Sequence, residues 1–121
     1  FISIIQPDIC HAGGLSELKK ISSAAETYYV SVAPHNSNGP ISTAASLHLD
    51  MTIPNCYKQE IFINYLEGYK KILTNNIKIE DGFTAPPIGP GLGTDINEEA
   101  MKEFPVSEYT PIESEPYKDF F

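Results

Sequence analysis

Basic residues are scarce in this chain of 121 residues. Eight Lys and Arg side chains stand against 16 Asp and Glu side chains, which gives a formal net charge of −8 at pH 7. Binding to a nucleic-acid backbone needs clustered Lys and Arg, so the composition argues against a nucleic-acid partner. An anionic small substrate is still compatible with this charge, because a bound metal ion can reverse the field at a site.

Cysteines and long apolar runs are also few. Cys10 and Cys56 do not have the spacing of metal ligands, and two cysteines are too few for a disulfide framework. We therefore expect two free thiols in a cytoplasmic protein. No apolar run approaches the length of a membrane span, so no membrane partner is expected. The chain opens on the apolar run "FISII" rather than on Met, and we interpret it as a piece of a longer polypeptide.

Apolar runs and helical patterns alternate through the first half of the chain. Continuous apolar runs are typical of strands that are covered on both faces. Strands are predicted at Phe1–Ile5, Val30–Ala33 and Cys56–Phe62. Strands that alternate with helices indicate parallel βαβ units and therefore the α/β class.

Two helices are predicted between these three strands. Ser16 suits the N-cap of the first helix. Pro40 suits the first turn of the second helix, which is expected to end at Pro54. The expected packing positions are Leu18, Ile21, Ala25 and Tyr28 in the first helix and Ile41, Ala44, Ala45, His48 and Met51 in the second.

The pattern changes in the last third of the chain, where the domain boundary is expected between residues 1–74 and 75–121. The dipeptide Asp81-Gly82 between two short apolar runs, 77–80 and 83–85, predicts a hairpin. A Pro/Gly-rich connector follows at Pro86–Gly93, and one short helix is expected within 94–104. Residues 106–121 are an acidic, proline-punctuated arm that ends in two Phe, and these aromatics indicate that the arm docks on another surface.

One ionisable side chain falls at the end of each predicted strand. These are Asp8, His35 and Glu60, which are separated by 27 and 25 residues. One βα unit of an eight-stranded barrel takes about 30 residues, and the carboxyl ends of barrel strands carry the catalytic groups. The spacing therefore predicts that the three side chains meet at one mouth. A carboxylate beside an imidazole favours its charged form and fixes its tautomer, which makes His35 a candidate general base oriented by Asp8.

Four stretches together carry a family resemblance: "QPDICHAGGLSELKKISSAAE", "VAPHNSNGP", "QE" at 59–60 and "EDGFTAPPIGPGLGTDINEE". They resemble the C-terminal part of the mandelate racemase and muconate lactonizing enzyme group of the enolase superfamily, and within it the galactonate-type acid-sugar dehydratases. The resemblance implies the last part of a (β/α)₇β TIM-like barrel, with a C-terminal tail that packs on a capping domain. The capping domain and the first five strands of that barrel would lie outside this chain.

The resemblance also implies a reaction. Members of the family abstract the proton α to a carboxylate and use Mg²⁺ to stabilise the enediolate. Asp8 and His35 match the Asp-His dyad of the family, and Glu60 matches the glutamate that hydrogen-bonds the substrate carboxylate. In a dehydratase the β-hydroxyl then leaves and a 2-keto-3-deoxy acid forms. The Mg²⁺ ligands of the family lie on earlier strands, so no metal ligand is expected in this chain.

Several expectations remain open at the level of sequence. His11, Asn36 and Asn38 lie on loops at the predicted mouth and are candidates for contact with an aldonic acid substrate, although loop residues of these types also serve structure. His48 is expected to pack or cap. A racemase, epimerase or cycloisomerase of the same superfamily is the nearest alternative reaction. A non-catalytic barrel fragment that acts as an interaction module is the alternative of another class. For the full-length protein we expect a homo-oligomer.

Overall fold

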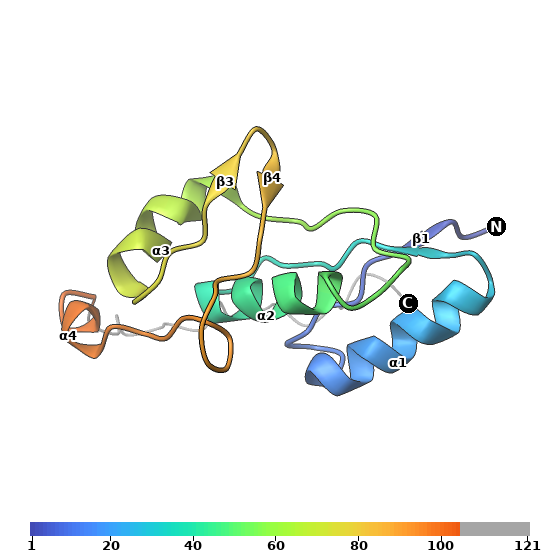
Figure 1. The fold of residues 1–121 in the computed structure, drawn as a ribbon, viewed down its shortest axis with the longest axis horizontal. Coiled ribbons are helices and arrows are strands. Elements are labelled where there is room, and N and C mark those ends of the chain that lie inside the picture. Colours follow the sequence, from blue (N-terminus) through green and yellow to red (C-terminus); the bar gives the residue numbers. More distant parts are fainter. Residues whose placement is uncertain (105–121) are drawn as a thin grey trace, which may run out of the picture.

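The fold opens with a βαβ unit. The computed structural model describes residues 1–104. Two parallel strands, β1 (Ile4–Ile5) and β2 (Ser31–Val32), are joined by helix α1 (Gly14–Thr27) (Figure 1). The predicted order of strand, helix and parallel strand is therefore confirmed. The acidic arm expected at 106–121 lies outside the described residues.

Both strands are shorter than their apolar runs. The parallel alignment nevertheless continues past the strands, where the His35 N–H donates to the Pro7 carbonyl at 3.2 Å and Asp8 forms an isolated parallel bridge with His35. Pro7 and Pro34 lie inside this continuation and have no N–H to donate. The regular ladder is therefore interrupted while the two backbones still run side by side.

The prediction of a third strand at Cys56–Phe62 is wrong. Cys56 alone pairs with the sheet, through an isolated parallel bridge to Val32. Beyond it, the amide of Gln59 donates to the Pro34 carbonyl at 3.2 Å, where a ladder would have used a backbone N–H. The segment 56–60 thus still follows the second strand. The backbone makes the contact at Tyr57, whose N–H donates to the Val32 carbonyl at 2.8 Å, and the side chain makes it at Gln59.

Helix α1 begins earlier than predicted. Its N-cap is Gly13, with φ of 102°, and Ser16 lies inside the helix. The left-handed conformation at Gly13 lets the chain turn directly from the loop into the helix, which a side chain there would strain. Leu18 and Ala25 are buried as expected, whereas Tyr28 lies just past the last turn and is 79% exposed.

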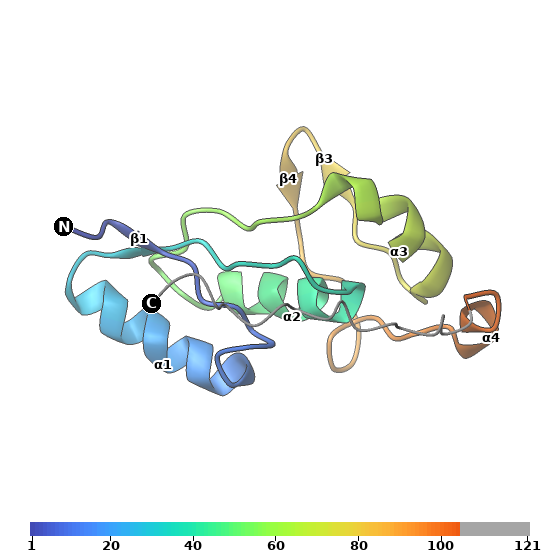
Figure 2. The ribbon, with the colours of Figure 1, turned by 180° about the vertical axis from the view of Figure 1, so that it is seen from behind.

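Helix α2 (Pro40–Asp50) begins with Pro40 in its first turn, as predicted, and ends at Asp50, before the expected Pro54. More faces of α2 are buried than the predicted packing positions indicated. Met51, one of those predicted positions, is instead 73% exposed. The reason is that α2 contributes to two cores. Leu49 packs with residues of α1 and β2, while Ala44 and Leu47 pack with the C-terminal part of the chain. Figures 1 and 2 show α2 between α1 and the C-terminal elements.

The C-terminal part contains a short 3₁₀ helix and helix α3, which the sequence patterns did not predict, followed by the predicted hairpin. The elements are η1 (Ile63–Tyr65), α3 (Leu66–Ile72), β3 (Ile79–Glu80), β4 (Phe83–Thr84) and α4 (Glu98–Met101). β3 and β4 form an antiparallel pair. Asp81 and Gly82 between them both have positive φ, which is the conformation of a type I′ hairpin turn. The short helix expected within 94–104 is confirmed as α4. Within residues 1–104 no helix has both the length and the apolar character needed to cross a membrane.

The chain on its own is expected to self-associate. Its β1 strand has one neighbour, β2, within residues 1–104, so its other edge is open, and large apolar side chains are exposed on the hairpin side, with Phe83 at 80% and Ile88 at 93%. Open strand edges and apolar patches favour association. Sedimentation velocity of the 121-residue polypeptide should show oligomers, and near-UV circular dichroism should show weak tertiary signals. Phe83→Ser with Ile88→Ser should shift the distribution toward monomer. A compact wild-type monomer with sharp near-UV bands would contradict this expectation.

Candidate active site

Asp8 and His35 are brought together by the two neighbouring strands. Each follows its strand after a proline, and the two residues face each other in a parallel bridge. His35 Nδ1 lies 2.6 Å from Asp8 Oδ2. The expectation that neighbouring strands place this carboxylate against this imidazole is therefore confirmed as geometry.

The Asp8 carboxylate is almost fully buried, with 7% of the side chain exposed. Its Oδ1 accepts the Cys10 N–H at 2.7 Å, and its Oδ2 accepts the Asn38 side-chain amide at 2.8 Å. Burial alone would raise the pKa of the Asp8 carboxyl, but the hydrogen bonds from His35, Cys10 and Asn38 outweigh burial and lower the pKa below its ordinary value. Asp8 is therefore ionised at neutral pH and accepts the hydrogen on His35 Nδ1.

Glu60 lies on the other side of the same imidazole. Its Oε2 is 3.9 Å from His35 Nε2 and accepts the Asn36 N–H at 2.9 Å. Because Asp8 accepts the hydrogen on Nδ1, neutral His35 has its lone pair on Nε2, the nitrogen that faces Glu60. The His35 side chain is 43% exposed, so a part of the imidazole is open to a ligand. Asp8 and Glu60 thus lie on either side of the half-exposed imidazole of His35.

Asn36 does not have the surroundings of a substrate ligand. The residue is 1% exposed. Its amide Nδ2 donates to Thr43 Oγ1 at 2.8 Å and to the Glu60 carbonyl at 3.2 Å, while its Oδ1 accepts the Ser42 hydroxyl at 3.1 Å. All these partners belong to the protein, so the sequence-based expectation of substrate contact at Asn36 is corrected. Asn36 instead joins Glu60 to the first turn of α2.

Asn38 lies against the dyad and is held from a distant part of the chain. Its side chain donates to Asp8, and its carbonyl accepts the Tyr69 hydroxyl at 2.8 Å. Tyr69, on α3, is a residue of the site that the sequence patterns did not reveal. Tyr65, Tyr69 and Ile72 recur at helical spacing, and this signal would have indicated α3.

The two other histidines have different positions. His11 is exposed on the loop after Asp8, where it contributes the smallest of the effects that lower the pKa of the Asp8 carboxyl. A substrate contact by His11 therefore stays a proposal. His48 Nε2 lies 3.0 Å from the Leu92 carbonyl, which fits the structural role expected for it.

Residues 1–104 do not form a metal site. No group of three or more His, Cys, Asp or Glu side chains in this range is arranged to hold a metal ion. Both Asp8 oxygens already accept protein donors, and one oxygen of Glu60 accepts a backbone N–H. Mg²⁺ prefers several oxygen ligands in octahedral geometry, which this set does not provide.

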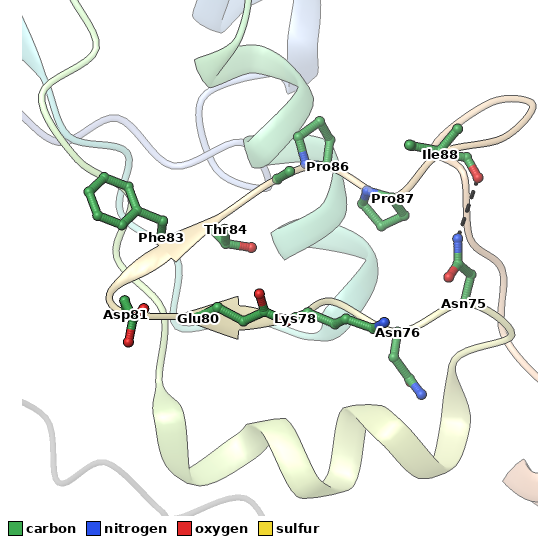
Figure 3. Close-up of a pocket in the computed structure, with 11 residues that line it drawn as sticks. Asn75, Asn76, Lys78, Glu80, Asp81, Phe83, Thr84, Pro86, Pro87 and Ile88 are labelled. Atoms are coloured by element: carbon green, nitrogen blue, oxygen red, sulfur yellow. Dashed lines mark hydrogen bonds between the residues drawn. The ribbon is translucent and has the colours of Figure 1, made fainter.

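A separate cavity is lined by the hairpin and by the segments directly before and after it. Its wall includes Lys78, Phe83 and Ile88, and the Asn75 amide donates to the Ile88 carbonyl at 3.4 Å (Figure 3). None of the three strand-end residues lines this cavity. Its charged residues form no ion pair with one another in the described structure. The chemistry of the candidate site is therefore elsewhere, at the exposed imidazole.

Comparisons with known proteins agree on one family. A family model described as "Enolase C-terminal domain-like" matches residues 1–100. The D-galactonate dehydratase of Ralstonia pickettii (strain 12J) is 43% identical over 114 residues, which cover 86% of this chain and 30% of that protein. The D-galactonate dehydratase of Cronobacter sakazakii (strain ATCC BAA-894) is 41% identical over 106 residues, covering 83% of this chain and 28% of that protein. The chain thus spans less than a third of the length of these curated relatives.

Solved structures give the same picture. The mandelate racemase/muconate lactonizing enzyme from Jannaschia sp. CCS1 superposes with a TM-score of 0.79 at 32% identity, covering 88% of this chain and 27% of that one. A member of the enolase superfamily from Salmonella Typhimurium superposes with a TM-score of 0.77 at 40% identity, covering 84% of this chain and 26% of that one.

The lowered pKa of Asp8 predicts a pH dependence of stability. A carboxyl whose folded pKa is depressed contributes stability above its unfolded pKa, near 3.9, and loses it as pH falls through the folded value. In the full-length protein, Asp8→Asn should lower the free energy of unfolding by about 1–3 kcal/mol at pH 7, since a buried charged hydrogen-bond partner is lost.

The measurement is urea unfolding at several pH values. The difference in the free energy of unfolding between wild type and Asp8→Asn should become smaller below about pH 4, where the carboxyl of the unfolded chain becomes protonated. Glu26→Gln, at an exposed glutamate of α1, is the control and should show no comparable gap. A gap that stays constant down to low pH would mean that the charge of Asp8 does not stabilise the fold.

Proposed function

The chain belongs to the Enolase C-terminal domain-like family, and on that premise we propose that the protein containing it is an acid-sugar dehydratase. Its substrate would be a galactonate-like aldonic acid, and its reaction a hydro-lyase reaction. The naming of both curated relatives as D-galactonate dehydratases supports this substrate class. Because the chain covers less than a third of these relatives, the activity is proposed for the whole protein.

Family and structural likeness confirm the fold class expected from the sequence, which is α/β with the C-terminal part of a TIM-type barrel. The division into a barrel part at 1–74 and a hairpin, connector and arm at 75–121 is retained as a proposal. A capping domain and five further barrel strands outside this chain belong to the same proposal.

The observation that carries the proposed function is the setting of His35. Its Nδ1 is bonded to a buried, ionised carboxylate at 2.6 Å, and its Nε2 is on an exposed side chain beside a second carboxylate. A histidine held in one tautomer with an accessible lone pair is suited to proton abstraction.

His35 Nε2 would take the proton α to the substrate carboxylate. The electrons of the C–H bond move onto the carboxylate to give an enediolate, and their return forms a double bond between the α and β carbons as the β C–O bond breaks. The hydroxyl leaves as water with a proton that replaces the one His35 took, which regenerates the neutral imidazole, and the resulting enol becomes a 2-keto-3-deoxy acid. The net change is the loss of one water.

Asp8 and Glu60 would assist in different ways. Asp8 fixes the His35 tautomer and stabilises the imidazolium that forms when the proton arrives. Glu60, when protonated, can donate a hydrogen bond from Oε1, which accepts no hydrogen bond from residues 1–104, to the substrate carboxylate. This bond would strengthen as charge develops on the carboxylate oxygen during proton abstraction.

Mg²⁺ is suggested by the family relationship. The described residues do not fit a Mg²⁺ site, so its ligands would have to come from outside residues 1–104. Cytoplasmic location and a homo-oligomeric full-length protein remain proposals of the same kind.

A racemase, epimerase or cycloisomerase is the alternative, favoured by the naming of a structural neighbour as a mandelate racemase/muconate lactonizing enzyme. A racemase needs a base on each face of the α carbon. Incubating the protein with aldonic acids in deuterated solvent separates the two reactions, because a dehydratase yields a keto acid and a racemase yields the labelled epimer.

Replacing His35 tests the proposed function directly. In the full-length protein, His35→Asn should lower the rate of α-proton exchange and of product formation by about 10²–10⁴-fold, the usual cost of losing a general base. Substrate affinity should change little, since Asn keeps a polar side chain. Asp8→Asn acts through the same imidazole, so the double variant should be far less impaired than the product of the two single effects. Near-wild-type exchange in His35→Asn would show that His35 is structural.

The 121-residue chain assayed alone should not dehydrate aldonic acids, with or without added Mg²⁺. The reason is that residues 1–104 provide no metal site. They also provide a single pair of parallel strands, β1 and β2, which cannot close a barrel mouth around a substrate. Formation of keto acids is followed with a semicarbazide assay, and the full-length protein is the positive control. Robust turnover by the chain alone would contradict both the barrel-fragment proposal and the need for outside ligands.

A further inference from the structure

A relay of hydrogen bonds joins α3 to the candidate base. The Tyr69 hydroxyl donates to the Asn38 carbonyl at 2.8 Å, and the Asn38 amide donates to Asp8 Oδ2 at 2.8 Å. The same Oδ2 atom lies 2.6 Å from His35 Nδ1. Building on the proposed function, we propose that Tyr69 and Asn38 are positioning residues that hold the Asp8 carboxylate in the orientation that His35 requires.

The shared oxygen is the reason that Asn38 matters. A carboxylate held by one donor can rotate about its side-chain bonds, whereas Asp8 receives donors on both oxygens, from the Cys10 N–H on Oδ1 and from Asn38 on Oδ2. The plane of the carboxylate is thereby fixed, and with it the direction in which Oδ2 accepts the His35 hydrogen. Orientation of this kind sets the efficiency of a general base.

Tyr69 anchors Asn38 because its ring is buried in a core. Tyr69 is 7% exposed and packs in a core with Ala44, Leu47, Leu73 and Ile77. A buried tyrosine ring leaves its hydroxyl as the one polar group to be satisfied, and the Asn38 carbonyl satisfies it. The loop that carries Asn38 is thus hydrogen-bonded to a buried residue of α3.

This role differs from the substrate contact that the sequence suggested for Asn38. A substrate ligand contributes mainly to binding, whereas a residue that orients the base contributes to the rate of proton transfer. The two roles therefore separate in KM and kcat. Tyr69 distinguishes the two roles clearly, because its hydroxyl donates to the backbone carbonyl of Asn38 and so acts through the protein.

The experiment compares three variants of the full-length protein: Tyr69→Phe, Asn38→Ala and the double variant. Loss of one hydrogen bond in the relay should lower kcat for α-proton exchange by about two- to tenfold with KM unchanged. The double variant should be no slower than Asn38→Ala alone, because both changes break the same relay. Tyr65→Phe is the matched control, since Tyr65 is 49% exposed, stacks on Phe62 and has a hydroxyl with no partner in residues 1–104.

A second readout does not need turnover. In protein labelled with ¹⁵N-histidine, the hydrogen on His35 Nδ1 should exchange with water about two- to tenfold faster in Tyr69→Phe and Asn38→Ala than in wild type or Tyr65→Phe. If the wild-type protein dehydrates no aldonic acid, the proposed function fails, and this exchange rate still decides the positioning role.

Three results would overturn the proposal while leaving the dehydratase function intact. The first is a Tyr69→Phe variant that matches Tyr65→Phe in both kcat and exchange rate. The second is Asn38→Ala with a raised KM and an unchanged kcat, which would make Asn38 a substrate ligand. The third is independent effects that multiply in the double variant, which would mean that the two residues do not act through one relay.

Discussion

The hydrogen bond between His35 Nδ1 and Asp8 Oδ2 is the contact on which the candidate site depends. It exists because two parallel strands end side by side and because their backbones stay aligned for three more residues, past Pro7 and Pro34. Prolines at these positions end the regular ladder, so the side chains that follow are free to face a site. A shift of register by one residue would turn one of the two side chains to the other face of the sheet.

Around this contact, buried polar groups replace the missing third strand. Asn36 is almost fully buried, and its amide joins Glu60 to the hydroxyls of Ser42 and Thr43 at the start of α2. A buried amide without partners would cost several times the energy of an ordinary hydrogen bond, so a fully satisfied amide fixes one arrangement of the loop. Glu60 is therefore held by a side-chain network where a barrel strand would have held it by a ladder.

Two buried carboxyls show how local donors decide the protonation state. Asp8 accepts three donors, and its pKa is lowered in spite of burial. Asp50, at the other end of α2, has no hydrogen-bond partner for its oxygens in the described structure, and burial raises its pKa to about 6, with the nearby Cys56 thiol offsetting a part of the rise. The Cys56 pKa rises to about 11 through burial and the charge of Asp50. The two aspartates thus differ in pKa because Asp8 accepts three N–H donors, whereas Asp50 faces only the weakly donating thiol of Cys56.

The sequence by itself determined the opening βαβ unit, helix α2, the hairpin and the positions of Asp8, His35 and Glu60, because turn residues, apolar runs and a spacing near one βα unit are local signals. Pro40, Asp81 and Gly82 marked their elements for the same reason. Tertiary structure decided what depends on contacts distant in the sequence: the loss of the third strand beside Pro34, the burial of Asn36, and the bond between Tyr69 and Asn38 across 31 residues. These contacts follow from the way α2 and α3 pack. Hydrophobic periodicity predicts which face of a helix is buried, but it does not predict which distant residue a polar side chain on that helix will contact.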